Sequence, residues 1–172
     1  KMSKSLGNFF TVRDVAKEFD YEVIRFFMLS AHYRSPINFS KDLMESASSA
    51  LERIYTCMDT LKFLKETASG EDARPEEIPV LEAVNGYKQK FIDAMDDDLN
   101  TADAISAIFE IVSEVNKNIT SASEPSEYLI EYILSVFDEL GSVLGILGRK
   151  EKETVPDEVK EMLEERKNAR AD

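Results

Sequence analysis

Apolar residues recur at spacings of three and four along most of this chain, and polar residues fill the positions between them. The pattern is clearest from residue 41 to residue 65, where one face carries Leu43, Ala47, Ala50, Ile54, Met58, Leu61 and Leu64. Because an α-helix has about 3.6 residues per turn, this spacing predicts a long amphipathic helix. Ser40 directly precedes it and is a suitable N-cap, since its hydroxyl can accept a bond from an unpaired backbone N–H.

Three further stripes of the same kind follow. They predict helices between about residues 81 and 96, from Thr101 to about residue 119, and between residues 129 and 147. Pro125 suits the first turn of the last helix, and Gly148 is placed to end it. The stripes consist of Leu81, Val84, Phe91 and Met95, then Ile105, Ile108, Val112, Val115 and Ile119, then Leu129, Ile133, Phe137, Leu140, Leu144 and Leu147.

Four long amphipathic helices with short connections predict a mainly all-α fold, an antiparallel helical bundle over residues 41–150. Residues 67–77 contain Gly70, Pro75 and many acids, and we expect an exposed loop there. Another loop is expected at residues 121–126. A fifth helix should start shortly after residue 151 and run to the end of the chain.

The first forty residues have a different pattern. Thr11, with Asp14 three residues later as a capping-box variant, predicts a short helix through Phe19. Asp20 is a suitable N-cap for a second helix up to about Ala31, which is apolar on nearly all sides and is therefore expected to be buried. A short extended segment should follow at residues 36–39, because a proline stands at its start.

Charge is distributed unevenly along the 172 residues. The whole chain has a net charge of −13, which argues against a general nucleic-acid binder. Residues 1–40 hold six basic and four acidic side chains, a net +2, so the remainder carries −15. Exposed charges act over one Debye length, about 8 Å at physiological salt. We therefore expect any contact with phosphate near the N-terminal end.

The first five residues read KMSKS. Lysine ammonium groups can reach phosphate oxygens and serine hydroxyls can add hydrogen bonds, although most such pentapeptides are solvated basic segments. The order of the residues resembles the signature of class I aminoacyl-tRNA synthetases, whose loop closes on ATP during amino-acid activation. The resemblance implies that Lys4 binds ATP and steadies the pyrophosphate side of the transition state. Lys1 would assist, Met2 would anchor the loop, and Ser3 and Ser5 would belong to the same ATP-binding segment.

Two further segments narrow the family. Residues 20–40 read DYEVIRFFMLSAHYRSPINFS, and residues 95–101 read MDDDLNT. Both resemble segments of cysteinyl-tRNA synthetases, with Leu99 where that family usually has Phe. The resemblance implies that residues 1–40 form the KMSKS loop and a stem-contact region. It also implies that residues 41–150 form a helical bundle of the tRNA-binding type and that residues 151–172 begin a C-terminal helix.

The resemblance also implies a reaction. Cysteinyl-tRNA synthetases join L-cysteine to tRNA(Cys) through cysteinyl-adenylate, using ATP. We expect this chain to lack the first half of the nucleotide fold and to be inactive alone. The family has a zinc ion that binds the cysteine thiolate, but its ligands would precede the KMSKS loop, so no metal site is expected here. We also expect the protein to be a monomer in the cytoplasm. Its expected partners are tRNA(Cys), ATP and L-cysteine, and no contact with membranes is expected.

Three charged or titratable residues near the N-terminus are candidates for tRNA contacts. His32 is the single histidine, and we expect it to order the junction by hydrogen bonding, close to tRNA. For Arg25 we favour an ion pair with Asp20 or Glu22. For Arg34, such an ion pair and a contact with the tRNA backbone are equally supported.

Two other features have structural interpretations. Asp96, Asp97 and Asp98 would fan out over different faces at a helix end, which makes them a poor set of metal ligands. We expect them to be solvated or to favour the helix that follows. The single Cys57 lies among core-spaced residues and is expected to be a buried structural thiol, and its isolation fits a reducing compartment.

Two other functions remain open. The cysteine ligase of the mycothiol pathway shares a KMSKS-type loop and activates cysteine without tRNA, but the segment from His32 to Ser40 fits the synthetase better. The other alternative is a stand-alone acidic helical module that binds protein, which predicts no contact with nucleotides.

Overall fold

Every regular element in the described residues, 11–119 and 124–148 of this computed structural model, is a helix, which confirms the all-α prediction. In chain order the elements are α1 (Val12–Val15), α2 (Tyr21–Leu29), α3 (Lys41–Lys65), η2 (Pro75–Glu77), α4 (Ile78–Asp96), α5 (Thr101–Asn118) and α6 (Glu127–Leu144). None of these helices is long and apolar enough to cross a lipid bilayer. The predicted helix after residue 151 lies outside the described residues.

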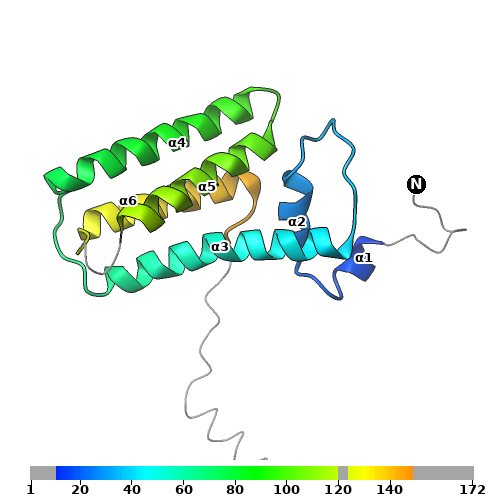
Figure 1. Cartoon of the computed structure of the whole chain (residues 1–172), viewed down its shortest axis with the longest axis horizontal. Helices are drawn as coiled ribbons and strands as arrows, with labels where there is room; N and C mark the ends of the chain where they lie inside the picture. The colour runs from blue at the N-terminus through cyan, green and yellow to red at the C-terminus, as the bar shows by residue number, and fades with distance from the viewer. Residues whose placement is uncertain (1–10, 120–123, 149–172) are drawn as a thin grey trace, which may run out of the picture.

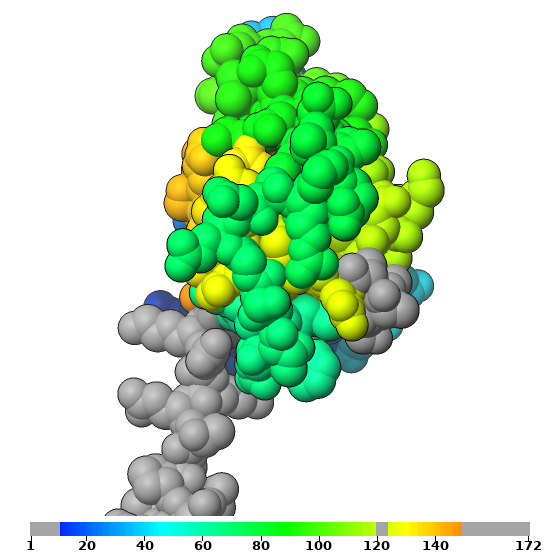
Figure 2. All heavy atoms as spheres, turned by 90° about the vertical axis from the view of Figure 1, so that its left-hand side faces the viewer, coloured from blue at the N-terminus to red at the C-terminus, as the bar shows by residue number. Residues whose placement is uncertain are grey.

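The four long helices lie alongside one another as a bundle, and α1 and α2 gather at the end where α3 begins (Figure 1). The core between them is apolar and closed to solvent. Its largest fully buried side chains include Met44, Ile54, Leu61, Val84, Ile108, Ile133 and Phe137. At the opposite end of the bundle, residues from the end of α3, from α4 and from α6 meet in one face (Figure 2).

The buried stripe of α3 differs by one residue from the prediction at two places. Leu43 is 42% exposed and Met44 is fully buried, and Leu51 is buried at 3% exposure while Ala50 is only partly so. Spacings of three and four fit two neighbouring faces of a helix equally well, so the choice depends on what packs there. The face that α2, α5 and α6 cover begins at Met44.

The starts of four helices follow local capping signals, whereas the ends of α1, α2 and α6 differ from the prediction. Thr11, Asp20, Ser40 and Ser126 each accept a hydrogen bond from a backbone N–H in the first turn of their helix, and Thr11 completes its capping box with Asp14. Pro125 therefore precedes the cap of α6 instead of lying in its first turn. The helix predicted through Phe19 ends at Val15, and the one predicted to reach Ala31 ends at Leu29.

The helix α2 is buried on one side only. Val23, Phe26 and Phe27 are buried, whereas Tyr21 is 68% exposed and Met28 is 56% exposed. The expectation of a helix buried all round is thus wrong. The outer face of α2 keeps two large side chains, those of Tyr21 and Met28, mostly exposed.

A buried carboxylate joins the starts of α4 and α6. Ser126, which is fully buried, donates to Glu77 from its backbone N–H at 2.7 Å and from its hydroxyl at 2.6 Å. Glu77 also accepts from the backbone N–H of Arg74 at 2.9 Å. The segment predicted as an exposed loop therefore ends in a buried residue, because this carboxylate pairs polar groups that two helix starts leave unsatisfied.

We expect Glu77→Ala to lower the free energy of unfolding by about 2–3 kcal/mol, because it leaves buried donors without an acceptor. Glu77→Gln is the matched control, since its amide oxygen can still accept one of the three bonds. Urea unfolding at neutral pH measures both, and equal stability of Glu77→Ala and the native chain would contradict the role assigned to this carboxylate.

The same carboxylate predicts a dependence on pH. Burial raises the pKa of Glu77, but the bonds donated by Ser126 and by the backbone N–H of Arg74 outweigh burial and hold it below the ordinary value of 4.5. The stabilisation is therefore complete above pH 4.5 and is lost as the pH falls through the lower folded pKa. Acid titration should destabilise the native chain more than Glu77→Gln, and identical acid profiles would contradict this.

Candidate functional site

The segment expected to bind ATP lies outside the described residues. This applies to Lys1, Met2, Ser3, Lys4 and Ser5, so their predicted roles are neither supported nor opposed by the structure. The described part of the site begins after α2, with the second matched segment.

Residues of the two other matched segments meet in space. Arg34 lies in the loop after α2, and its Nη2 is 3.0 Å from Oδ2 of Asp98, in the turn between α4 and α5. The phenol of Tyr33 donates to Oδ1 of Asp98 at 2.8 Å and accepts from Nε of Arg34 at 2.9 Å. We call His32, Tyr33, Arg34 and Asp98 the Arg34–Asp98 cluster. It joins residues that are 64 positions apart in the chain.

His32 contributes to the cluster through its ring. It stacks on Tyr33 with ring centroids 4.8 Å apart, and its Nδ1 accepts from the backbone N–H of Arg34 at 3.2 Å. Its Nε2 is 3.9 Å from Oδ2 of Asp98, which is too far for a hydrogen bond. The expected role of His32 in ordering this loop through hydrogen bonding agrees with these contacts.

The turn that carries Asp98 has an unusual backbone. Asp98 and Leu99 have φ angles of 57° and 55°, in the left-handed region that residues other than glycine seldom adopt. Backbone bonds hold the turn, from the N–H of Leu99 to the carbonyl of Met95 at 3.1 Å and from that of Asn100 to Ala94 at 3.0 Å. Asn100 then caps α5 by accepting from the N–H of Asp103.

The ion pair of Arg34 bears on one of the two interpretations left open for it, and the contact with the tRNA backbone stays a prediction. Arg34 does form an ion pair, but with Asp98 and not with Asp20 or Glu22. Its side chain is 67% exposed and that of Asp98 is 42% exposed, so the pair contributes little to stability, about 0–1 kcal/mol. The phenol of Tyr33 has a raised pKa, chiefly because it donates to the Asp98 carboxylate.

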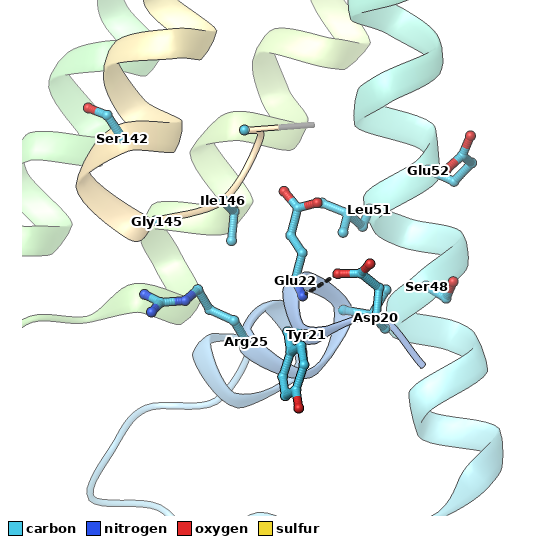
Figure 3. Close-up of a pocket in the computed structure, with 12 residues that line it drawn as sticks. Asp20, Tyr21, Glu22, Arg25, Ser48, Leu51, Glu52, Ser142, Gly145 and Ile146 are labelled. Atoms are coloured by element: carbon cyan, nitrogen blue, oxygen red, sulfur yellow. Dashed lines mark hydrogen bonds between the residues drawn. The ribbon is translucent and has the colours of Figure 1, made fainter. Parts of the chain in front are cut away.

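A pocket of about 730 Å³ lies between α2, α3 and the end of α6 (Figure 3). Glu22 extends into the space between α3 and the end of α6. It accepts from the hydroxyl of Tyr55 at 2.7 Å and from the backbone N–H of Leu147 at 2.6 Å. The lining contains three carboxylates, those of Asp20, Glu22 and Glu52, and one guanidinium, that of Arg25. An anionic nucleotide would therefore meet net negative charge here, and we assign the pocket a structural role.

The ion pair favoured for Arg25 is wrong. Its Nη1 donates instead to the carbonyl oxygen of Leu144, the last residue of α6, at 3.2 Å. That helix ends in Gly145, with a φ of 66°, and not at Gly148 as predicted. Helix ends leave carbonyl groups unpaired, and a guanidinium satisfies one of them here.

The described residues offer no metal site. Across residues 11–119 and 124–148 no group of three His, Cys, Asp or Glu side chains could hold a metal ion. Cys57 is 2% exposed, and burial raises the pKa of its thiol to about 12, which keeps it protonated.

Sequence reasoning did not predict that Tyr33 and Asp98 belong to the Arg34–Asp98 cluster, or that Glu22 bonds to Leu147. The first two lie inside the segments matched to a family, so the resemblance marked their neighbourhood without indicating that they touch. Nothing in the local sequence links Glu22 to Leu147, which is 125 positions away.

Comparison with known proteins gives family matches to two parts of the chain. A family model described as the catalytic domain of class I (C) tRNA synthetases matches residues 1–49, and the DALR domain model matches residues 90–148. The first match contains Arg34 and the second contains Asp98, so the cluster connects the two.

A cysteine–tRNA ligase of Lachnospira eligens is 48% identical to the chain over all 172 residues, and the chain spans 36% of the length of that relative. A solved structure of a ternary complex of Agrobacterium radiobacter K84 LeuRS with tRNA and LeuAMS matches with a TM-score of 0.60. It is 22% identical and covers 86% of this chain and 21% of that one. At this identity the likeness concerns the fold alone.

The contact between Arg25 and the end of α6 predicts that alanine substitutions at Gly145 and Gly148 change the stability of the protein by different amounts. A Cβ at Gly145 would lie 2.6 Å from Nη1 of Arg25 and would sit on a left-handed backbone, whereas a Cβ at Gly148 would meet nothing within 4 Å. We expect Gly145→Ala to lower the free energy of unfolding by about 1–2 kcal/mol, the strain of a left-handed residue with a side chain. Gly148→Ala is the matched control and should be nearly neutral in urea unfolding. The reverse order would show that Gly148 ends the helix.

Proposed function

Because the chain belongs to the cysteinyl-tRNA synthetase family, we propose that it is the C-terminal, tRNA-binding region of an enzyme that ligates L-cysteine to tRNA(Cys). The observation that carries the proposal is the 48% identity to a cysteine–tRNA ligase over the whole chain. In this enzyme ATP and L-cysteine first form cysteinyl-adenylate, and the cysteinyl group then passes to tRNA. The chain spans about a third of such a protein and would not catalyse the reaction alone.

The proposal divides the chain by function. Residues 1–40 would comprise the KMSKS loop and the stem-contact region, residues 41–150 the helical bundle that binds tRNA, and residues 151–172 the start of a further helix. The catalytic-domain match over residues 1–49 and the DALR match over residues 90–148 support this order.

Lys4 would act on the chemical step. Negative charge grows on the pyrophosphate leaving group as the adenylate forms, and an ammonium group placed there stabilises the transition state more than the bound ATP. Lys1 would assist, Met2 would anchor the loop, and Ser3 and Ser5 would donate hydroxyl hydrogen bonds to the nucleotide. Zinc, if bound by the longer enzyme, would hold the substrate thiolate through ligands outside the described residues.

Contact with tRNA is assigned to the N-terminal end. Arg34 keeps most of its side chain exposed while it pairs with Asp98, so it remains able to reach a phosphate. His32 stacks beneath Tyr33 and would order the contact. We further propose a monomer in the cytoplasm, a reducing compartment that suits a chain with one buried cysteine.

The test replaces Lys4 in the full-length enzyme. We expect Lys4→Ala to slow ATP–pyrophosphate exchange by about 10²–10³-fold, as for other donors that meet charge in a transition state, with little change in cysteine binding. Lys17→Ala is the control, because Lys17 is an exposed lysine of the same region that pairs only locally, with Asp14.

Unchanged exchange in Lys4→Ala would refute the assignment of the loop. Exchange that is intact while no cysteine is transferred to tRNA by the native enzyme would favour a ligase that activates cysteine for another acceptor. Absence of cysteine-dependent exchange in the native enzyme would reject both.

A further inference from the structure

The guanidinium of Arg34 is held along one edge. Its Nε donates to the phenol oxygen of Tyr33 at 2.9 Å, and its Nη2 donates to Oδ1 of Asp98 at 3.2 Å and lies 3.0 Å from Oδ2. Nη1 of Arg34 makes no hydrogen bond to residues 11–119 or 124–148. The outer edge of the fork therefore faces solvent, with Nη1 and the second hydrogen of Nη2 available.

The partners of Arg34 are themselves fixed. Tyr33 is stacked on His32, and the guanidinium carbon of Arg34 is 5.4 Å from the centre of the Tyr33 ring. Asp98 sits on a left-handed backbone in a turn held by bonds to the last turn of α4. A long, exposed side chain is thus ordered before any ligand binds, which removes part of the entropy cost of binding.

The free edge suits one kind of ligand. Two parallel N–H groups of a guanidinium match two oxygens of a phosphate, and such charge-assisted pairs are short and directional. His32, Tyr33 and Arg34 lie in residues 1–40, which carry a net charge of +2, and the cluster lies at the junction of the two matched domains. Resting on the proposed function, we propose that Asp98 and Tyr33 are positioning residues that present the outer edge of Arg34 to a backbone phosphate of the bound tRNA.

If Asp98 and Arg34 form only an ion pair, removing Asp98 should change the affinity for tRNA in the opposite direction. If Asp98 only neutralises Arg34, removing its charge frees the guanidinium and tightens the binding of an anion. If Asp98 positions Arg34, its removal loosens the guanidinium and weakens binding, even though a negative charge has been removed.

The experiment measures the affinity of the 172-residue chain for a fluorescently labelled tRNA(Cys) transcript by anisotropy, at several KCl concentrations. We expect Asp98→Ala to weaken binding by about three- to tenfold, as when one long side chain must be ordered on binding. Asp98→Asn keeps an acceptor oxygen and should bind within about twofold of the native chain. Tyr33→Phe, which removes the phenol acceptor of Nε, should weaken binding in the same direction.

Arg34→Gln tests the phosphate contact itself. It should weaken binding and reduce the slope of log affinity against log salt by about 0.7–0.9, the value for one phosphate. In the Arg34→Gln background, Asp98→Ala should have no further effect, because there is no guanidinium left to position. Asp97→Ala is the matched control, because it removes the same charge from the same exposed turn and should leave affinity unchanged or slightly tighter. Thermal unfolding of each variant verifies that it is folded.

The outcomes separate the two proposals. Tighter or unchanged binding by Asp98→Ala overturns the positioning role, as does an equal loss in the native and Arg34→Gln backgrounds. Unchanged affinity and salt slope in Arg34→Gln, with a native chain that binds, overturn the phosphate contact and leave the tRNA-binding function in place. A native chain that does not bind the transcript overturns the proposed function of this region.

Discussion

The end of α6 is held by side chains of α2, and this contact determines how residues 11–40 sit on the bundle. The guanidinium of Arg25 satisfies the carbonyl of Leu144, and the carboxylate of Glu22 accepts from the N–H of Leu147. Both residues lie on one face of α2, three positions apart. The hydroxyl of Thr101 donates at 2.8 Å to the carbonyl of Leu29, so the start of α5 satisfies the other end of the same helix.

These polar contacts matter because apolar packing alone leaves the helix free to slide. Phe26 and Phe27 bury their side chains against the bundle, but apolar contacts have little directional preference. The hydrogen bonds with the carbonyl of Leu144, the N–H of Leu147 and the hydroxyl of Thr101 have defined lengths and directions, and they fix the position of α2. The loop that leaves it then places Arg34 against Asp98.

Sequence reasoning succeeded where the cause is local. The N-caps at Thr11, Asp20 and Ser40 act within three residues, and all three were predicted. It failed where the cause is distant. Arg25 was paired with its neighbours in the chain, but its partner is 119 positions away. The one-residue error at Leu43 has the same origin, since only the packing of other helices distinguishes two faces with the same spacing. The segments that resemble a family lay close to both contacts, and neither contact follows from a motif.

Native-state amide hydrogen exchange in low denaturant tests most directly whether α2 and the bundle form one cooperative unit. The amides of Phe26 and Phe27 would be compared with those of Ile111 in α5 and Ile133 in α6. If α2 and the bundle are one cooperative unit, both groups exchange through the same global opening, with free energies that agree within about 1 kcal/mol. Exchange of the α2 amides through a separate opening about 3 kcal/mol or more below the global one would contradict it. In that case residues 11–40 would be attached to the bundle without being positioned by it.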